Sequence, residues 1–510
     1  MKKTIEKILS FKSSGFFIPI VFPPYVVISG LCLCWILGLG ILGYSNLQMF
    51  WWYIPFCFLA IFLGYRNPLY FLCCFILILP LAGFLNAVLS LKAIHLLMPI
   101  FLSGCIGRFL RKIPSRSGDK IILPKPVWIF LVVFTLFAFF SILSHVKYIP
   151  DWKRIVAHLP WAEVPLANAF GWIMLSFLNL IAGILFFEWV LTITVEKKNV
   201  YLFIKMLMIG IIISFLFGLG QVMRILPLGG IFQNFFLGGS RYNTTFIDPS
   251  SLGIFCALSF AIWLGYILYN GHKIYWICGP MLMFLILISG SRSAVLLGLV
   301  GILVFVGVTL IQQKKFSIFI ICISLFVFVA MFNFHKKLNG PTRITNYVNN
   351  LASTKWDVDH LKKILGDRVI LWQAGWVTFK KNPIFGVGTG QYLMRMPEYK
   401  DEISMIVNDN SGNMYLHIAA ENGVLGLIVF IYLLGTFVRR FVTEEIKKKK
   451  IIEVASFSSF IGLLVAIFFG GHLLSFSVSF LFWFQLAIFA PLPSYSRILK
   501  DRSRQRAKIA

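Results

Sequence analysis

Long apolar runs, separated by short polar breaks, occupy most of this 510-residue chain. A helix needs roughly 20 apolar residues to cross about 30 Å of hydrocarbon, because each residue advances it by about 1.5 Å. By this measure the pattern predicts about fourteen membrane-spanning helices, within a range of 12 to 14. Their expected positions are 25–45, 48–64, 68–90, 93–110, 126–146, 168–190, 201–222, 251–269, 274–289, 293–312, 316–334, 420–438, 452–470 and 474–490.

The longest polar interruption, at 335–419, separates the eleventh and twelfth predicted spans. Connections within helix bundles are usually about 2–8 residues long, and much longer loops often carry function. We therefore expect an all-α, polytopic transmembrane helix bundle in three parts. These are a bundle of about eleven spans at 1–334, a loop domain with short helices at 335–419, and C-terminal transmembrane helices with a basic tail at 420–510.

Within that loop, the stretch 367–381 has apolar residues at helical spacing, including Trp372, and is stopped by Pro383. This pattern predicts an amphipathic helix that lies on the bundle or at the membrane interface. The glycine-rich stretch Gly386–Gly390 resembles a nucleotide-binding loop only superficially, because it lacks a βαβ context and a suitably placed lysine. It is expected to form a turn after the helix.

The overall composition supports a lipid environment. Hydrophobic residues make up 59% of the chain and charged residues 13%, with a mean hydropathy of +0.85. Soluble domains are nearer 45–50% apolar and about 25% charged, so the excess apolar surface must face lipid. All nine cysteines lie inside apolar runs without a CxxC pair. They are expected to act as small hydrophobic residues, and no metal site is predicted.

The net charge of +28 would suggest nucleic acid in a soluble protein, but here the basic residues gather in short loops between apolar runs. This is the positive-inside pattern of a cytoplasmic-membrane protein, so no nucleic-acid partner is expected. The fourteen spans place all of these loops, and both termini, on the cytoplasmic side. The opposite, periplasmic side then receives 147–166, 223–250 and 335–419.

Two arginines are expected where spans meet that opposite face, Arg241 before the eighth span and Arg292 between the ninth and tenth. A guanidinium group is a planar fork of donors that binds phosphate oxygens and keeps its charge. Either arginine alone is explained as well by snorkelling at a helix end. Asp248, followed by Pro249, has the pattern of a helix N-cap, which is sufficient to explain its presence.

A second polar group stands at the end of the long loop. Asn413, His417 and Glu421 are spaced at i, i+4 and i+8, so on a helix they form one stripe among apolar residues. A histidine one turn from a glutamate can act as a base with an orienting carboxylate. The alternative is the water-facing side of a helix end. His472, in the last outer turn, is a lone histidine for which a structural role is expected.

The order of these motifs resembles that of the O-antigen ligase and O-antigen polymerase superfamily of bacterial membrane glycosyltransferases. The resemblance covers about 200–440. It is carried by Arg241 to Pro249 before a span, Gly290 to Ser293 at a span end, Arg368 with Trp372, Pro383 with Gly386 and Gly388, Asn413 with Tyr415 and Leu416, and Glu421 with Gly423 and Gly426.

The resemblance implies a GT-C-like fold and an enzyme that takes a glycan from undecaprenyl diphosphate at the periplasmic face. It needs no nucleotide sugar, cofactor or metal, and it joins the glycan to a hydroxyl of a glycan or of lipid A core. A chain-length regulator or another envelope-assembly protein is a possible partner. The residues implied to hold the diphosphate and glycan are Arg292, Arg241, Arg368, Asp248, Asn413 and Tyr415.

One position departs from the family pattern. Ligases of this family carry a histidine before the asparagine, where this chain has Gly412 before Asn413. Three possibilities stay open: His417 backed by Glu421 replaces the missing base, Glu421 acts directly, or the mechanism differs. The departure favours a repeat-unit polymerase over a lipid A core ligase.

Two functions of other classes remain as alternatives, a transporter or flippase for lipid-linked glycans and a non-catalytic assembly partner. Transporters of this size often show internal repeats and polar residues at the bilayer midplane. The chain shows no duplication, and its predicted span centres are nearly free of charge. A charge there costs about 2.5–3.5 kcal/mol on insertion scales, so a charged translocation path is not indicated.

Overall fold

The structure is a computed structural model, and part of the chain is described by it. The described residues are 17–20, 30, 32, 47–88, 97–111, 121–145, 169–194, 197–223, 225, 241–246, 248–270, 273–312, 368–395, 410–443, 446 and 449–489. The predicted span at 316–334, nearly all of the one at 25–45, and much of the 335–419 loop lie outside these residues.

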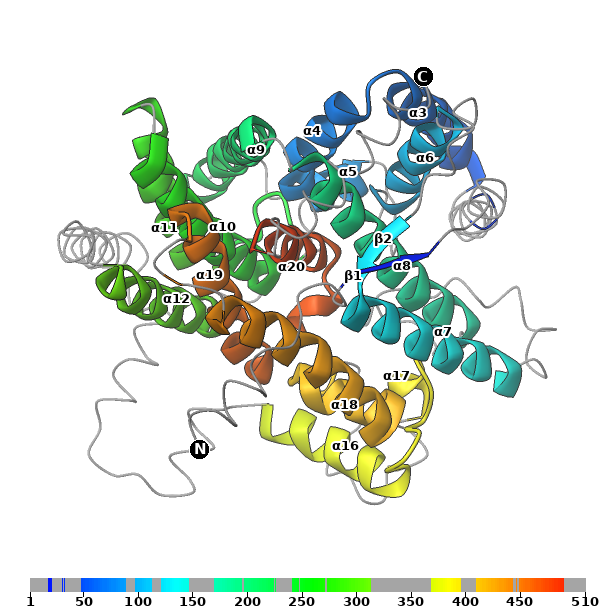
Figure 1. The fold of residues 1–510 in the computed structure, drawn as a ribbon. Coiled ribbons are helices and arrows are strands. Elements are labelled where there is room, and N and C mark those ends of the chain that lie inside the picture. The colour runs from blue at the N-terminus through cyan, green and yellow to red at the C-terminus, as the bar shows by residue number, and fades with distance from the viewer. Residues whose placement is uncertain are drawn as a thin grey trace, which may run out of the picture.

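Helices form almost all of the described structure (Figure 1). They are α3 (Leu47–Arg66), α4 (Pro68–Ile78), η2 (Leu79–Leu81), α5 (Ala82–Val88), α6 (Leu97–Leu110), α7 (Lys125–His145), α8 (Ala169–Ile193), α9 (Lys197–Val222), α10 (Pro249–Asn270), η5 (Lys273–Ile277), α11 (Cys278–Ser289), α12 (Arg292–Ile311), α16 (Arg368–Lys381), α17 (Tyr392–Arg395), α18 (Met414–Thr443), α19 (Ile451–Ala466), η8 (Ile467–Phe469), η9 (His472–Leu474) and α20 (Phe476–Phe489).

Within the described residues, 8 helices are long and apolar enough to cross a membrane, and shorter apolar helices accompany them. Together they coincide with twelve of the predicted spans, which confirms an all-α polytopic membrane protein. The span count of the whole chain stays a prediction. One boundary differs: α18 begins at Met414 rather than at 420. His417 therefore lies inside this helix and not in the preceding loop.

A small sheet was not expected from the sequence. Strand β1 (Phe17–Ile20) pairs antiparallel with β2 (Ile121–Pro124), Phe17 lying opposite Pro124. Four-residue apolar strands are too short to show a period of two in the sequence, so only their tertiary pairing reveals them. The sheet lies at the start of α7 and leaves the helical class of the bundle unchanged.

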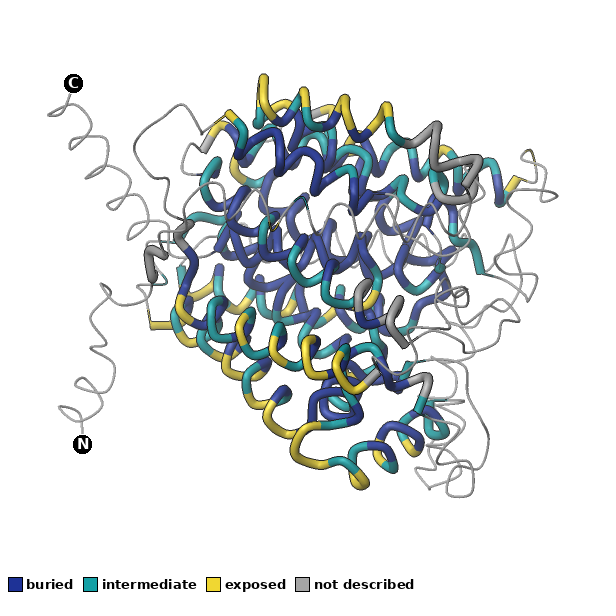
Figure 2. Tube along the Cα trace, turned by 90° about the vertical axis from the view of Figure 1, so that its right-hand side faces the viewer, coloured by how far each residue is buried: buried dark blue, intermediate teal, exposed yellow. Residues whose placement is uncertain are grey.

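The core of the bundle forms around α20, which packs against α8, α10 and α19. Four phenylalanines from four helices, Phe75, Phe101, Phe186 and Phe480, meet there with ring centroids 4.9–5.9 Å apart. Buried residues fill the centre of the molecule and exposed ones lie on its outer helices (Figure 2). In an 18-residue apolar stretch of α10, 94% of the residues are buried, as expected for a helix that is apolar on every side.

Small residues let neighbouring helices approach closely. A Cβ added to Gly462 of α19 would lie 2.5 Å from the carbonyl oxygen of Leu297 in α12. A Cβ added to Gly265 of α10 would lie 2.5 Å from the Cβ of Ala455 in α19. Because lipid tails are as apolar as the helices, such close packing is a main source of helix association in membranes. These contacts fix α10 and α12, which carry the candidate site, against α19.

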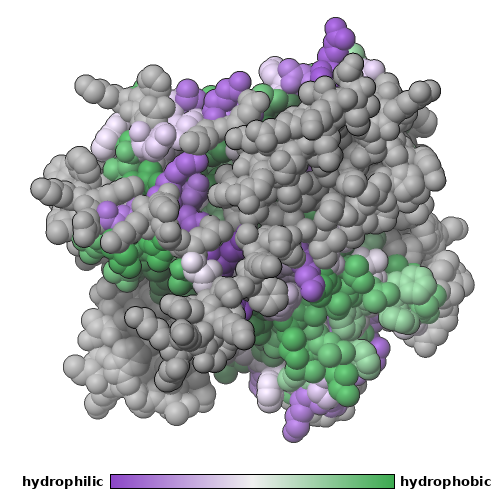
Figure 3. Space-filling model, viewed as in Figure 1, coloured by the Kyte–Doolittle hydropathy of each residue, from purple (hydrophilic) through white to green (hydrophobic). Residues whose placement is uncertain are grey.

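The lipid-facing side is visible over α7 and α18, where hydrophobic atoms gather on the surface (Figure 3). Exposed apolar residues here include Leu136 and Phe140 of α7, and Leu425 and Ile428 of α18, which are 41–62% exposed. In water such a surface would drive association, whereas in a bilayer it contacts acyl chains.

The described helices alternate in direction, so their ends form two groups. At one end, which we call the basic end, lie Arg66, Arg108, Lys197, Lys273, Arg440 and Lys450. Hydrogen bonds join some of these loops: Arg111 Nη1 donates to the Arg66 carbonyl oxygen at 3.3 Å. Gln312 Nε2 donates to the Ile446 carbonyl oxygen at 2.7 Å. The opposite end, where α10, α12 and α18 begin, we call the arginine end.

A buried ion pair stabilises the basic end. Arg108 of α6 donates to Glu188 of α8 through Nη1 at 2.6 Å and Nη2 at 3.2 Å, and both residues are buried. The guanidinium carbon also lies 5.1 Å from the ring centre of Trp189. Two parallel charge-assisted hydrogen bonds and a cation–π contact satisfy a charge that would otherwise be costly to bury.

Candidate functional site

The turn between α11 and α12 is the centre of the arginine end. Gly290 ends α11 in the left-handed region with φ of 61°, where glycine is favoured, and its N–H donates to the Leu287 carbonyl oxygen. Ser291 then caps α12 by accepting from the Ala294 N–H at 3.3 Å. As a result Arg292 is the first residue of α12, and its side chain is half-buried at the helix N-terminus.

Arg241 lies across the same turn. Its Nε donates to the Ser289 carbonyl oxygen at 2.9 Å, and its Nη2 donates to Ser250 Oγ at 2.8 Å. The neighbouring Tyr242 N–H donates to the Ile288 carbonyl oxygen at 2.9 Å. The structure therefore brings both predicted arginines to one short turn. Two positive charges at one turn of an apolar bundle create a favourable place for an anion.

The segment that carries Arg241 is inserted into the bundle. Thr244 adopts a φ of 49°, and its N–H donates to Gln221 Oε1 at 3.0 Å. Ser214 Oγ lies 2.7 Å from Thr245 Oγ1, which also donates to the Pro80 carbonyl oxygen at 2.6 Å. Both threonines are buried. This anchor was not predicted from the sequence, in which Pro80 inside an apolar run signals only an irregular helix. The Phe84 N–H, which a regular helix would direct to the Pro80 oxygen, donates to the Thr245 carbonyl oxygen at 2.9 Å.

Asp248 has the capping role that its sequence context suggested. Its Oδ2 accepts from the Ser251 N–H at 2.8 Å and from Ser251 Oγ at 3.2 Å. A Cβ added to Gly253 would lie 2.5 Å from Ser289 Oγ, so the first turns of α10 pack tightly on the α11–α12 turn. Asp248 thus fixes the start of α10, and with it the Ser250 hydroxyl that holds Arg241.

The predicted polar stripe is present at the start of α18. Asn413 caps the helix, since its Oδ1 accepts from the Leu416 N–H at 3.1 Å. His417 Nε2 lies 3.5 Å from Glu421 Oε1, and both residues are buried. The Tyr392 ring packs on His417 with centroids 5.2 Å apart, and the Tyr392 N–H donates to Glu421 Oε1 at 3.4 Å. The pair is therefore enclosed by α17.

The glycine-rich loop is seated on a break in α18. Gly423 has φ of 64° and ψ of −169°, which leaves the carbonyl groups before it without helical partners. The Val387 N–H donates to the Ala420 carbonyl oxygen at 2.9 Å, and the Gly388 N–H to that of Glu421 at 2.8 Å. A Cβ on Gly423 would overlap the Ile384 carbonyl. The loop does more than form the expected turn, because it completes the backbone hydrogen bonds of the break.

Tyr415 and His417 face different sides of α18. Tyr415 Oη donates to the Leu464 carbonyl oxygen of α19 at 2.9 Å. Two residues on, about 200° around the helix, His417 faces Tyr392 and the α16–α17 side. The structure thus unites Asn413, His417 and Glu421 as a cluster, but it directs His417 away from the side of α18 that contacts α19.

Arg368 is the first residue of α16, and this end of α16 lies near Gly412 and the residues that follow α19. One turn later Trp372 Nε1 donates to the Gly412 carbonyl oxygen at 3.2 Å, and its ring packs on Phe468 and Phe469 with centroids 5.5 and 6.3 Å away. Burial and, to a smaller degree, the Arg368 charge lower the pKa of His472 to about 3. Arg368 and His472 are therefore electrostatic neighbours.

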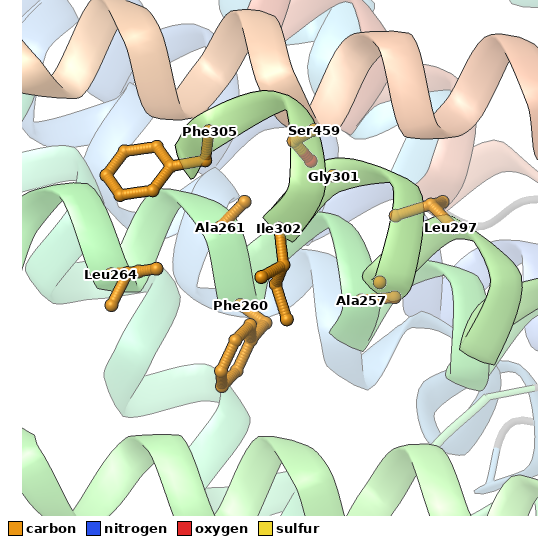
Figure 4. Close-up of a pocket in the computed structure, with 10 residues that line it drawn as sticks. Ala257, Phe260, Ala261, Leu264, Leu297, Gly301, Ile302, Phe305 and Ser459 are labelled. Atoms are coloured by element: carbon orange, nitrogen blue, oxygen red, sulfur yellow. The ribbon is translucent and has the colours of Figure 1, made fainter. Parts of the chain in front are cut away.

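A small crevice lies between α10, α12 and α19 (Figure 4). Its walls are apolar except for Ser459, whose Oγ donates to the Leu258 carbonyl oxygen at 3.0 Å. It contains none of the predicted site residues and offers no group for catalysis. In the described part of the chain, no three His, Cys, Asp or Glu side chains come close enough to hold a metal ion.

The fold and these groups define a polytopic membrane protein with a cluster of cations at one end of the bundle. Residues 277–431 match the family model described as O-antigen ligase. The match supports the O-antigen ligase and polymerase superfamily, as the sequence motifs predicted, and with it a membrane glycosyltransferase of this general type. It includes Arg292, Arg368 and the His417–Glu421 pair. A comparison with curated proteins found no match.

Proposed function

We propose that the protein is a repeat-unit polymerase that transfers undecaprenyl-diphosphate-linked oligosaccharide at the periplasmic face, for surface polysaccharide synthesis. The observation that supports it most is the position of Arg241 and Arg292 at a single turn, inside the apolar bundle that the O-antigen ligase family match overlaps. A lipid-linked diphosphate is the anion whose charge and membrane location suit that turn.

The proposed chemistry places the arginines on the leaving group. When the bond between the sugar and the diphosphate breaks, negative charge grows on the diphosphate oxygens. Fixed positive groups in a site of low polarity stabilise that charge strongly, without reorganisation during the reaction. Arg292 at the N-terminus of α12 adds the positive end of the helix dipole to its own charge. Arg241 and Arg368 are proposed to bind the same diphosphate or the glycan next to it.

The charge of the two ends supports the proposed periplasmic location. The basic end carries the loops rich in lysine and arginine, which the positive-inside rule places in the cytoplasm. The arginine end is then periplasmic, and both chain termini are cytoplasmic. Lipid-linked repeat units displayed at the periplasmic face would reach the arginines directly.

Other predicted site residues are held by intramolecular hydrogen bonds. Asp248 and Asn413 cap α10 and α18, and Tyr415 binds α19 through its hydroxyl. As glycan ligands these residues stay predictions, and the contacts give each of them a role in shaping the site. His417 with Glu421 likewise stays the sequence-based prediction for the base.

The polymerase is preferred to a ligase because Gly412 occupies the position of the family histidine that precedes Asn413. The size distribution of surface glycan in a deletion strain separates the two functions. Loss of long chains, with a single repeat still attached to its acceptor, supports the polymerase. Complete chains that accumulate on the lipid carrier would instead indicate ligation to lipid A core. Lipid-linked repeats that fail to reach the periplasmic side would indicate a flippase.

A further inference from the structure

His472 lies in the break between α19 and α20, in a position that the mechanism has not used. Helix η8 ends at Phe469, Gly470 and Gly471 follow, and His472 opens η9. Helix η9 packs against α20 and α10, the latter being the helix whose first turn holds Arg241. His472 is 8% exposed. It therefore stands at the arginine end of the bundle, enclosed by helices that build the site.

The position of the missing family histidine is close to His472 in space. The Gly412 N–H donates to Asn410 Oδ1 at 3.0 Å. A Cβ added to Gly471 would lie 2.7 Å from the same oxygen, so Asn410 contacts the residue directly before His472. The two segments are far apart in the sequence. The fold nevertheless places a histidine from the α19–α20 break beside the loop where family ligases carry theirs.

The start of α16 closes this group from a third side. Trp372 donates to the Gly412 carbonyl oxygen and packs on Phe468 and Phe469, which lead into the break. Arg368 lies one turn earlier on the same face of α16. Because burial and the Arg368 charge lower the pKa of His472 to about 3, the imidazole is neutral at neutral pH. The neutral form is the one that accepts a proton.

The imidazole has an unused acceptor or donor atom. Nε2 of His472 is buried and has no hydrogen-bond partner within the described residues. It faces Gly470, where an added Cβ would lie 2.5 Å from it. Burying a polar atom without a partner costs free energy that a phenylalanine in this apolar setting would avoid. A structural role alone therefore accounts poorly for a histidine here.

His417 lies in a different environment from His472. It has Glu421 beside it and Tyr392 packed on its ring, and it faces the α16–α17 side of α18. Its Nδ1 is also buried without a hydrogen-bond partner in the described part of the chain, so it is a fair competitor. The described contacts of the His417 side chain are with Glu421 and Tyr392, whereas Asn410 joins the Gly412 loop segment to the residue directly before His472.

We propose that His472 accepts the proton of the acceptor hydroxyl, in place of the family histidine whose position is Gly412; this rests on the proposed function. The proton moves from the hydroxyl oxygen to Nε2, and an electron pair of that oxygen forms the bond to the anomeric carbon. The bond between that carbon and the diphosphate oxygen breaks, and its electron pair leaves with the polyprenyl diphosphate. A bound diphosphate would offset the Arg368 charge, which is the smaller of the two causes that lower the pKa of His472, and would raise that pKa in part.

The test compares full-length variants that replace the wild-type gene in the source bacterium. Washed membranes are assayed for glycan extension, with the strain's own lipid-linked oligosaccharide as the donor, and membrane abundance is measured by immunoblot. His472→Gln keeps a side chain of similar volume, His472→Phe keeps an aromatic ring, and both remove the base. A general base usually contributes about 10²–10⁴-fold, so both should lower the extension rate by that factor at normal abundance. His417→Gln is measured in parallel as the competing assignment, and a larger loss of extension in it than in His472→Gln would overturn the proposal.

Added imidazole provides a readout that a purely structural role would not change. In His472→Ala it should restore part of the lost rate, because a free imidazole can enter the space left by the side chain. Extension by His472→Phe or His472→Gln within about tenfold of wild type would overturn the proposal, as would a loss in His472→Ala that imidazole leaves unchanged. Arg292→Ala, measured in parallel, separates the two claims, because full activity in that variant contradicts the proposed function itself.

Discussion

Arginines at the two ends of the bundle are held in opposite ways. At the basic end, Arg108 forms two hydrogen bonds with the carboxylate of Glu188 and contacts Trp189, so its charge is neutralised inside the protein. At the arginine end, the described hydrogen bonds of Arg241 go to the Ser289 carbonyl and the Ser250 hydroxyl. These two neutral oxygens orient the guanidinium group at the turn.

The difference separates a structural arginine from a candidate binding arginine. A pair such as Arg108 and Glu188 holds two helices together and has nothing left to offer a ligand. Arg241 and Arg292 instead place two positive charges at the turn that begins α12, a position that favours an anion. Substitutions at the basic end should therefore affect stability, and those at the arginine end should affect activity.

The largest effect is expected for Arg108→Leu. It leaves Glu188 as an unpaired charge among buried residues, and breaking a buried pair in this way costs about 3–5 kcal/mol. The measurement is the thermal stability of the detergent-solubilised protein. It is read as the temperature at which heating abolishes the monodisperse peak in size-exclusion chromatography. The double variant Arg108→Leu with Glu188→Leu should be more stable than the single one, and an equal loss in both would show that the ion pair is not the cause.

Arg292→Ala should abolish long-chain glycan with little change in stability. Removing one fixed donor to a developing anion typically lowers a rate by about 10²–10³-fold. Arg292→Lys should recover little activity, since an ammonium group cannot reproduce the planar fork of donors. Glycan chain length on gels is the readout, and Lys380→Ala, an exposed cation of α16, is the control. Long chains at wild-type amounts in Arg292→Ala would contradict the proposed role of Arg292 in binding the diphosphate.

Gly423→Ala should destabilise the arginine end by about 1–3 kcal/mol, because a residue with a side chain is strained at φ of 64°. Its Cβ would also overlap the Ile384 carbonyl and separate α18 from the glycine-rich loop. Gly435→Ala in the same helix is the matched control, since an added Cβ there meets nothing within 4 Å. Equal thermal stability of the two variants would contradict the structural role of the break.

The smallest effect is expected for Ser250→Ala, which removes the hydroxyl that accepts from Arg241 Nη2. A hydrogen bond to a charged group contributes about 1.5–3 kcal/mol, part of which the Ser289 carbonyl retains here. We expect about a tenfold loss of glycan extension, equivalent to about 1.4 kcal/mol. Ser251→Ala, which alters the cap of α10, serves as the comparison. If it is the more damaging of the two, the cap and not the Arg241 contact would be the important feature.

Much of the site was visible in the sequence because its residues stand at the ends of apolar runs. Arg241, Arg292 and Asp248 were placed at one face from span counting alone. The structure brings the two arginines to one turn and places Asp248 at the start of the neighbouring α10. The residues that surround His472 could not be predicted from the sequence. Its relation to Arg368 and Gly412 depends on contacts among three segments that are separated by many residues.

The sequence by itself determined the class of the protein, the approximate bounds of its helices and the ends at which charges collect. These features follow from local hydropathy, because a bilayer imposes one length and one polarity on every segment that crosses it. Only the tertiary structure decided the insertion of Thr244 and Thr245 beneath Arg241, the seating of the glycine-rich loop on α18, and the position of His472. Each of these is a close contact between distant segments, and its stability depends on packing and hydrogen-bond geometry that no local pattern encodes.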